Sequence, residues 1–185
     1  MRTHQSNFCV VIVCLVSVLS FAQEPTQQKP ATSVLLEVVR NSWDVDRNET
    51  LVYLRVYSDG LAEAHSMKNV DFRHIEFKKK QLPKGELAAL LGLLSDPGTL
   101  QLKPEYVRYW GNKDFGYKYE ITISASSQKR AIELVNFQPF AARKKGKPYP
   151  KQLEKLGCRI WKLRAEVSGE PLEKNWLSGC AEFGY

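Results

Sequence analysis

The chain has 185 residues, of which 43% are hydrophobic and 25% charged, and its 27 lysines and arginines against 20 acidic residues give a formal net charge of +7. This length suits one domain with a hydrophobic core and is short for two. Apart from one apolar run near the start, no segment approaches the roughly 20 apolar residues of a membrane-spanning helix, which argues against a bundle of such helices.

The first segment is typical of a secretory signal peptide. Arg2 precedes an apolar run from Phe8 to Leu19, and small residues lie three and one positions before a possible cut after Ala22. The run is too short to cross a bilayer as a helix, which takes about 20 residues. We therefore expect residues 1–22 to be removed. The mature protein would begin at Gln23, lack a transmembrane segment, and be exported to the periplasm or the extracellular medium.

The next segments alternate between polar connections and strands. Residues 23–33 are polar and contain two prolines, so they predict a flexible leader. The β-branched stretch "VLLEVVR", residues 34–40, predicts a first strand, and "NSWDVDRNE", residues 41–49, predicts a polar connection. In "TLVYLRVY", residues 50–57, the strand period of two places Val52, Leu54 and Val56 together on a strongly apolar face.

A tight hairpin follows this strand. Asp59-Gly60 supplies the positive φ angles that such turns require, so Asp59 is interpreted as a turn residue and not as a catalytic carboxylate. Residues 61–66 would return as a short strand. Residues 70–82, "VDFRHIEFKKKQL", predict another, half-buried strand with Ile75 and Phe77 on one face.

Two helices and a second hairpin complete the pattern. Leucines at helical spacing follow Pro83, and Asp96-Pro97-Gly98 ends that helix. "KYEITISAS" and "RAIELVNF", residues 118–126 and 130–137, alternate as the two strands of the hairpin. The last helix begins near Pro150 and ends at Gly169, with one apolar stripe formed by Leu153, Leu156, Ile160, Leu163 and Val167.

The order strands, helix, strands, helix indicates an α+β fold. We expect an antiparallel sheet of about five to six strands with two helices packed on one face. Residues 34–169 would form the domain. Once the signal peptide is gone only Cys158 and Cys180 remain, and an oxidising compartment favours their pairing. This disulfide would tie residues 170–185, a C-terminal tail, to the last helix.

Cations and aromatic side chains provide the candidate ligand-binding residues. One cluster lies before the first helix and another before the last, and aromatic residues gather in "EYVRYWGNKDFGYKYE", residues 105–120. The alternatives are a solvated basic face and aromatic residues that fill the core. The candidates are Lys78, Lys79, Lys80, Lys84, Arg143, Lys144, Lys145, Lys147, Tyr109 and Trp110.

The sequence offers little support for catalysis. It contains no G-x-S-x-G, no H-E-x-x-H and no glycine-rich phosphate loop, so we predict no catalytic residues and no cofactor. His65 and His74 could meet across neighbouring strands near Glu63 or Asp71, as a small hydrolase or a metal site would require, but we expect neither. The Asp44 and Asp46 pair lacks the rest of a calcium loop.

The succession "LVYLRVYSDGLAEAH", "FKKKQLPKGELAALLGLLSDPG", "YKYEITISASSQKRAIELVNF" and "YPKQLEKLGCRIWKLRAEVSG" resembles a family of small exported bacterial α+β domains. The shared outline covers about residues 34 to 168: a strand ending in Asp-Gly, a helix after a basic strand, a hairpin, and a C-terminal helix that starts at proline. The resemblance is one of layout and implies no functional residue.

These observations lead to one functional expectation. We expect an exported, non-catalytic binding or interaction domain at the cell envelope. Its partner would be an anionic envelope polymer, lipid headgroups or an acidic protein, and nucleic acid fits less well in that compartment. The alternatives are the hydrolase built on His65 and His74, and a module that inhibits or binds a partner protein.

Overall fold

The computed structural model describes residues 32–44, 47–66, 76–107, 116–125, 128–139, 146, 148–171 and 179–184. The predicted signal peptide and residues 23–31 of the predicted leader lie outside these ranges. Ser33, assigned to the leader from sequence, already bonds to the folded part: its carbonyl accepts from Ser58 N at 2.8 Å, and its amide donates to Ser58 Oγ at 3.1 Å.

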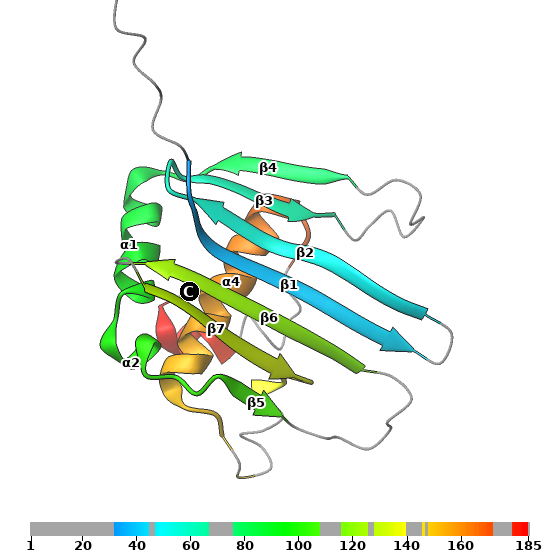
Figure 1. Cartoon of the computed structure of the whole chain (residues 1–185). Helices are drawn as coiled ribbons and strands as arrows, with labels where there is room; N and C mark the ends of the chain where they lie inside the picture. The colour runs from blue at the N-terminus through cyan, green and yellow to red at the C-terminus, as the bar shows by residue number, and fades with distance from the viewer. Residues whose placement is uncertain are drawn as a thin grey trace, which may run out of the picture. The chain divides into compact units, whose positions relative to one another are not determined.

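The described part is mixed α+β and contains one seven-stranded sheet in the order β4-β3-β2-β1-β6-β7-β5 (Figure 1). All neighbouring strands are antiparallel except β5 and β7, which are parallel. The sheet is therefore larger than expected and not purely antiparallel. Its strands are β1 (Val34–Asp44), β2 (Arg47–Tyr57), β3 (Leu61–His65), β4 (Phe77–Gln81), β5 (Glu105–Val107), β6 (Gly116–Ala125) and β7 (Gln128–Val135).

The predicted polar connection at residues 41–49 is wrong for most of its length. β1 continues to Asp44 and β2 begins at Arg47, and Asn41 pairs with Thr50. Polar side chains stabilise this extension, since Thr50 Oγ1 donates to Asn41 Oδ1 at 2.7 Å and Asn41 Nδ2 donates to Glu120 Oε1 at 3.0 Å. Polar residues suit these strands because this face of the sheet meets solvent.

A bulge in β2 changes which residues face the core. Val38 pairs with Leu54 and Val39 with Val52, so Tyr53 is the extra residue on β2. Leu54 is fully buried as expected, but Tyr53 is buried as well and Val52 only half-buried. The predicted apolar face therefore holds at Leu54 and Val56 and is wrong at Val52.

The predicted turn at Asp59-Gly60 is confirmed. Gly60 has a φ of 85°, its amide donates to Tyr57 O at 3.0 Å, and Leu61 N donates to Asp59 Oδ1 at 3.0 Å. The side chain of Asp59 thus stabilises the turn in which it lies. A Cβ at position 60 would lie 2.8 Å from Gln81 Nε2, so both the φ angle and the space favour glycine.

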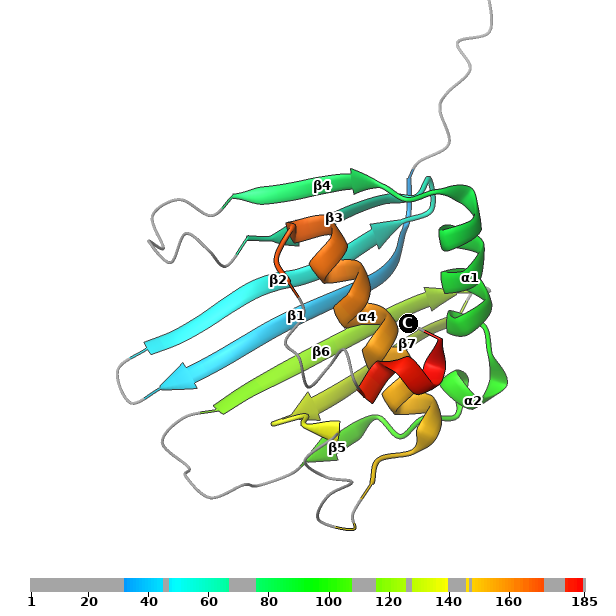
Figure 2. The ribbon, with the colours of Figure 1, turned by 180° about the vertical axis from the view of Figure 1, so that it is seen from behind.

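The helices are α1 (Lys84–Leu94), α2 (Pro97–Leu100), α4 (Lys151–Ser168) and the 3₁₀ helix η1 (Ala181–Phe183). α4 crosses one face of the sheet, while α1 and α2 lie at one end of the strands (Figure 2). The predicted starts after Pro83 and Pro150 are confirmed, as is the end of α4 at Gly169, which has a φ of 69°. All five residues of the predicted stripe on α4 are buried.

β4 differs from the half-buried strand expected over residues 70–82. Residues 70–75 lie outside the described ranges, and four of the five residues of β4 are exposed. The reason is topological, because β4 is the edge strand next to β3. Phe77, expected to be inward, is 41% exposed.

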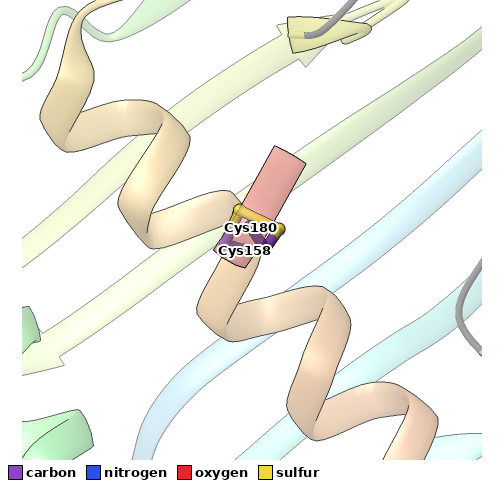
Figure 3. The surroundings of a disulfide bond; sticks show 2 residues. All are labelled: Cys158 and Cys180. Atoms are coloured by element: carbon purple, nitrogen blue, oxygen red, sulfur yellow. A yellow bond between two sulfur atoms is a disulfide. The ribbon is translucent and has the colours of Figure 1, made fainter. Parts of the chain in front are cut away.

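The predicted disulfide is present. Cys158 and Cys180 are bonded, with 5.5 Å between their Cα atoms, and the bond holds the start of η1 against the middle of α4 (Figure 3). Among the described residues, no helix is long and apolar enough to span a membrane.

We predict that replacing both Cys158 and Cys180 with alanine lowers the free energy of unfolding by about 3 kcal/mol, because the bond closes a loop with a sequence separation of 22 residues. Urea denaturation of the two proteins under non-reducing conditions measures this difference. Parent protein treated with dithiothreitol is the control and should match the variant. Equal stability of all three samples would contradict the prediction.

Candidate functional site

The lysines of β4 lie on two faces of the sheet. Side chains alternate along a strand, so Lys80 reaches α4 and bonds Glu166, with 3.4 Å between Nζ and Oε2. Lys79 points to the uncovered face and bonds Glu63, with 2.8 Å between Nζ and Oε1. Lys78 is paired with Glu76. The predicted cluster is therefore divided and partly neutralised, although all three side chains remain at least 42% exposed.

A row of alternating charges crosses the uncovered face of the sheet. Glu37, Arg55, Glu63 and Lys79 lie opposite one another on four consecutive strands. Arg55 Nε donates to Glu37 Oε1 at 2.8 Å, and Tyr57 Oη donates to Glu63 Oε2 at 3.0 Å. The hydrogen bond from Lys79 lowers the pKa of Glu63, so this carboxylate stays ionised. Cross-strand pairs of this kind stabilise the sheet.

His65, the last residue of β3, bonds no carboxylate in the described part of the chain. Its side chain is buried and stacks on Phe77, with 4.1 Å between ring centroids. Burial lowers the pKa of His65, and the nearby Arg55 lowers it further. Glu63, the carboxylate expected to support it, is instead bonded to Lys79 and Tyr57. His74 and Asp71 lie outside the described residues.

Lys84, the first residue of α1, is exposed. The remaining predicted site residues lie outside the described part of the chain. They are Arg143, Lys144, Lys145, Lys147, Tyr109 and Trp110. Pro148–Pro150, which follow the second basic cluster, lead directly into the start of α4. Lys80 meets α4 at Glu166, about 22 Å along the helix from Lys151 at 1.5 Å per residue. Lys80 of the first cluster is thus bonded far along α4 from the end of the helix that follows the second cluster in the sequence.

A shallow groove lies at the start of α4. It has a volume of about 510 Å³ and is lined by Lys151, Gln152 and Lys155 of α4 and by Glu182 and Phe183 of η1. Gln152 Nε2 is fixed by a hydrogen bond of 2.8 Å to Thr99 Oγ1 of α2. The far wall of the groove is η1, which the disulfide holds beside α4.

Two of the three charged side chains that line the groove are cationic, and the third, Glu182, is acidic. Lys151 and Lys155 lie one helical turn apart and share a side of α4. The first turn makes no side-chain cap hydrogen bond, and it contains one buried acid, Glu154. Sequence reasoning missed both lysines, although their spacing of four just after "ARKKGKPYP" was a usable signal.

Among the described residues, no group of three or more histidine, cysteine, aspartate or glutamate side chains could hold a metal ion. The side chains of Asp44 and Asp46 lie outside those residues. The chain matches no protein-family model, and no curated protein is similar to it in sequence. We therefore infer the function from the arrangement of charges.

We predict that His65 titrates below its usual pKa of about 6.5 because burial disfavours the imidazolium. Since the unfolded chain takes up the proton first, this residue reduces stability as the pH falls below about 6.5. An NMR titration of the histidine Cε1 protons, in protein that begins at Gln23, measures the pKa of His65. His74, the only other histidine after Gln23, provides an internal comparison. A midpoint for His65 at or above 6.5 would contradict the prediction.

Proposed function

We propose that this protein is an exported, non-catalytic binding domain for anionic phosphodiester polymers of the cell envelope. The observation that carries the proposal is the groove at the start of α4, where Lys151 and Lys155 outnumber the single acid in the lining, Glu182. Neither lysine has an ion pair among the described residues, in contrast to Lys78, Lys79 and Lys80. These two cations are therefore available to an external anion.

The sequence contains further positive charge shortly before α4. Arg143, Lys144, Lys145 and Lys147 precede Pro148 by a few residues, and α4 begins three residues later. An extended polymer could contact both sets of cations at once, and each lysine near an anionic surface contributes about 1 kcal/mol at physiological salt. We infer that the ligand is recognised by repeated charge. An enclosed pocket is not needed for this kind of recognition.

Two features support export. The first is the apolar run with a possible cut after Ala22. The second is the disulfide between Cys158 and Cys180, which forms and persists in oxidising compartments. An exported basic domain meets envelope phosphodiesters before it meets nucleic acid.

We predict that Lys151→Ser with Lys155→Ser raises the Kd for soluble poly(glycerol phosphate) by about tenfold or more at low salt, because two lysine contacts are lost. Adding Lys144→Ser, Lys145→Ser and Lys147→Ser should weaken binding further. Fluorescence anisotropy with labelled polymer measures the effect. Binding by the parent should fall as salt shortens the screening length to about 8 Å at physiological ionic strength.

The matched control removes the same charge elsewhere, by Lys103→Ser with Lys129→Ser. Both residues are exposed and lie outside the groove. The control should bind nearly as well as the parent, and all variants should keep the melting temperature of the parent. Equal weakening by the two double variants would reject the groove. Binding to phosphatidylglycerol vesicles and not to the free polymer would identify lipid headgroups as the target.

The proposed export leads to a separate prediction about the N-terminus of the protein. The intact mass of the protein recovered from a secreting bacterial host should correspond to a chain beginning at Gln23, because the predicted signal peptidase site follows Ala22. A variant with Ala22→Arg should retain the N-terminal segment, since a large cation does not fit the small-residue cleavage position. Full-length mass for the exported parent would contradict the proposal.

A further inference from the structure

β4 leaves one of its two edges without a partner in the described part of the chain. The strand pairs with β3 and ends the sheet order on that side. Both views of the ribbon show it at the margin, with no labelled element beyond it (Figures 1 and 2). An unpaired edge presents a row of backbone donors and acceptors to another strand.

The hydrogen-bond register identifies which groups face outward. Leu82 N donates to Gly60 O at 2.9 Å, and Ser66 N donates to Glu76 O at 3.1 Å. Since hydrogen-bonded pairs recur at every second residue of an antiparallel ladder, the intervening pairs Ala62 with Lys80 and Ala64 with Lys78 use the inner edge too. The backbone groups of Phe77, Lys79 and Gln81 therefore point away from the sheet.

The side chains of this edge determine which strand can join it. In an antiparallel pairing of two copies centred on Lys79, lysine would lie opposite lysine, and like charges directly opposite destabilise a pair. Edge lysines are a common device against such self-pairing. The same charges favour a strand with acidic residues. At the start of the edge, Phe77 is 41% exposed and offers an apolar contact.

We propose that the outer edge of β4 binds an extended acidic segment of a partner protein by antiparallel strand addition. The backbone of Phe77, Lys79 and Gln81 would supply the hydrogen bonds. Lys78, Lys79 and Lys80 are 42%, 59% and 43% exposed in their side chains, and they would contact three consecutive acidic residues beside or in place of their present partners Glu76, Glu63 and Glu166. An apolar residue would follow them, opposite Phe77. This surface is separate from the groove at the start of α4, so each proposal can fail without the other.

The first test uses synthetic peptides and leaves the protein unchanged. The probe is fluorescein-labelled TVEEEVT, whose fourth residue would lie opposite Lys79. Methylating the second, fourth and sixth amide nitrogens removes the hydrogens that face β4 and should abolish binding. Methylating the third and fifth, which face away, should leave binding within about twofold. Equal binding by the two methylated peptides, or no binding by the probe at millimolar concentration, would overturn the proposal.

The second test uses variants of the edge. Lys79→Thr and Lys79→Pro remove the same charge, but only proline also removes the outward N–H, and edge strands tolerate proline at such positions. The probe should bind Lys79→Thr measurably and Lys79→Pro not at all, with both variants folded by circular dichroism. Lys78→Gln with Lys80→Gln should raise the Kd by about tenfold. Equal binding of TVEEEVT and TVQQQVT would contradict the acidic preference.

Discussion

Trp161 of α4 packs against Tyr53, Tyr119 and Phe137, with ring centroids 5.5, 4.9 and 5.9 Å away. This cluster joins β2, β6 and the chain after β7 to one helix and so fixes α4 across the sheet. Burial raises the pKa of Tyr53 to about 12 and that of Tyr119 above its usual value, so both hydroxyls stay neutral in the core. The Arg164 guanidinium lies 4.6 Å from the Tyr53 ring centroid, which adds a cation–π contact.

The position of α4 determines which surfaces remain for binding. Because the helix covers one face, the other carries the charge row from Glu37 to Lys79, whose members bind one another. This row of two acids and two cations is consequently balanced in charge. Unbalanced charge lies at the start of α4, and unpaired backbone lies along β4. Both proposed surfaces are thus set by where the helix and the sheet end.

The sequence predicted the features that depend on local chemistry. The starts of the helices after proline, the Asp-Gly turn and the apolar stripe of α4 are each specified within a few residues. The two cysteines that follow the predicted cleavage site allowed one pairing. The bulge at Tyr53, the three-residue strand β5 and the exposure of Phe77 depend on strand order, which no local pattern contains. The groove was missed for the same reason, because its far wall comes from η1 through the disulfide.

Residue-resolved hydrogen–deuterium exchange of the mature protein, with and without poly(glycerol phosphate), tests most directly the claim that binding occurs where α4 begins. The amides of Lys151 and Gln152 precede the first intrahelical hydrogen bonds, so they should exchange fast in the free protein. The account predicts that the polymer slows exchange in this first turn and leaves the strands of the uncovered face unchanged. Slowed exchange across β1, β2 and β6 with none at the start of α4 would contradict it.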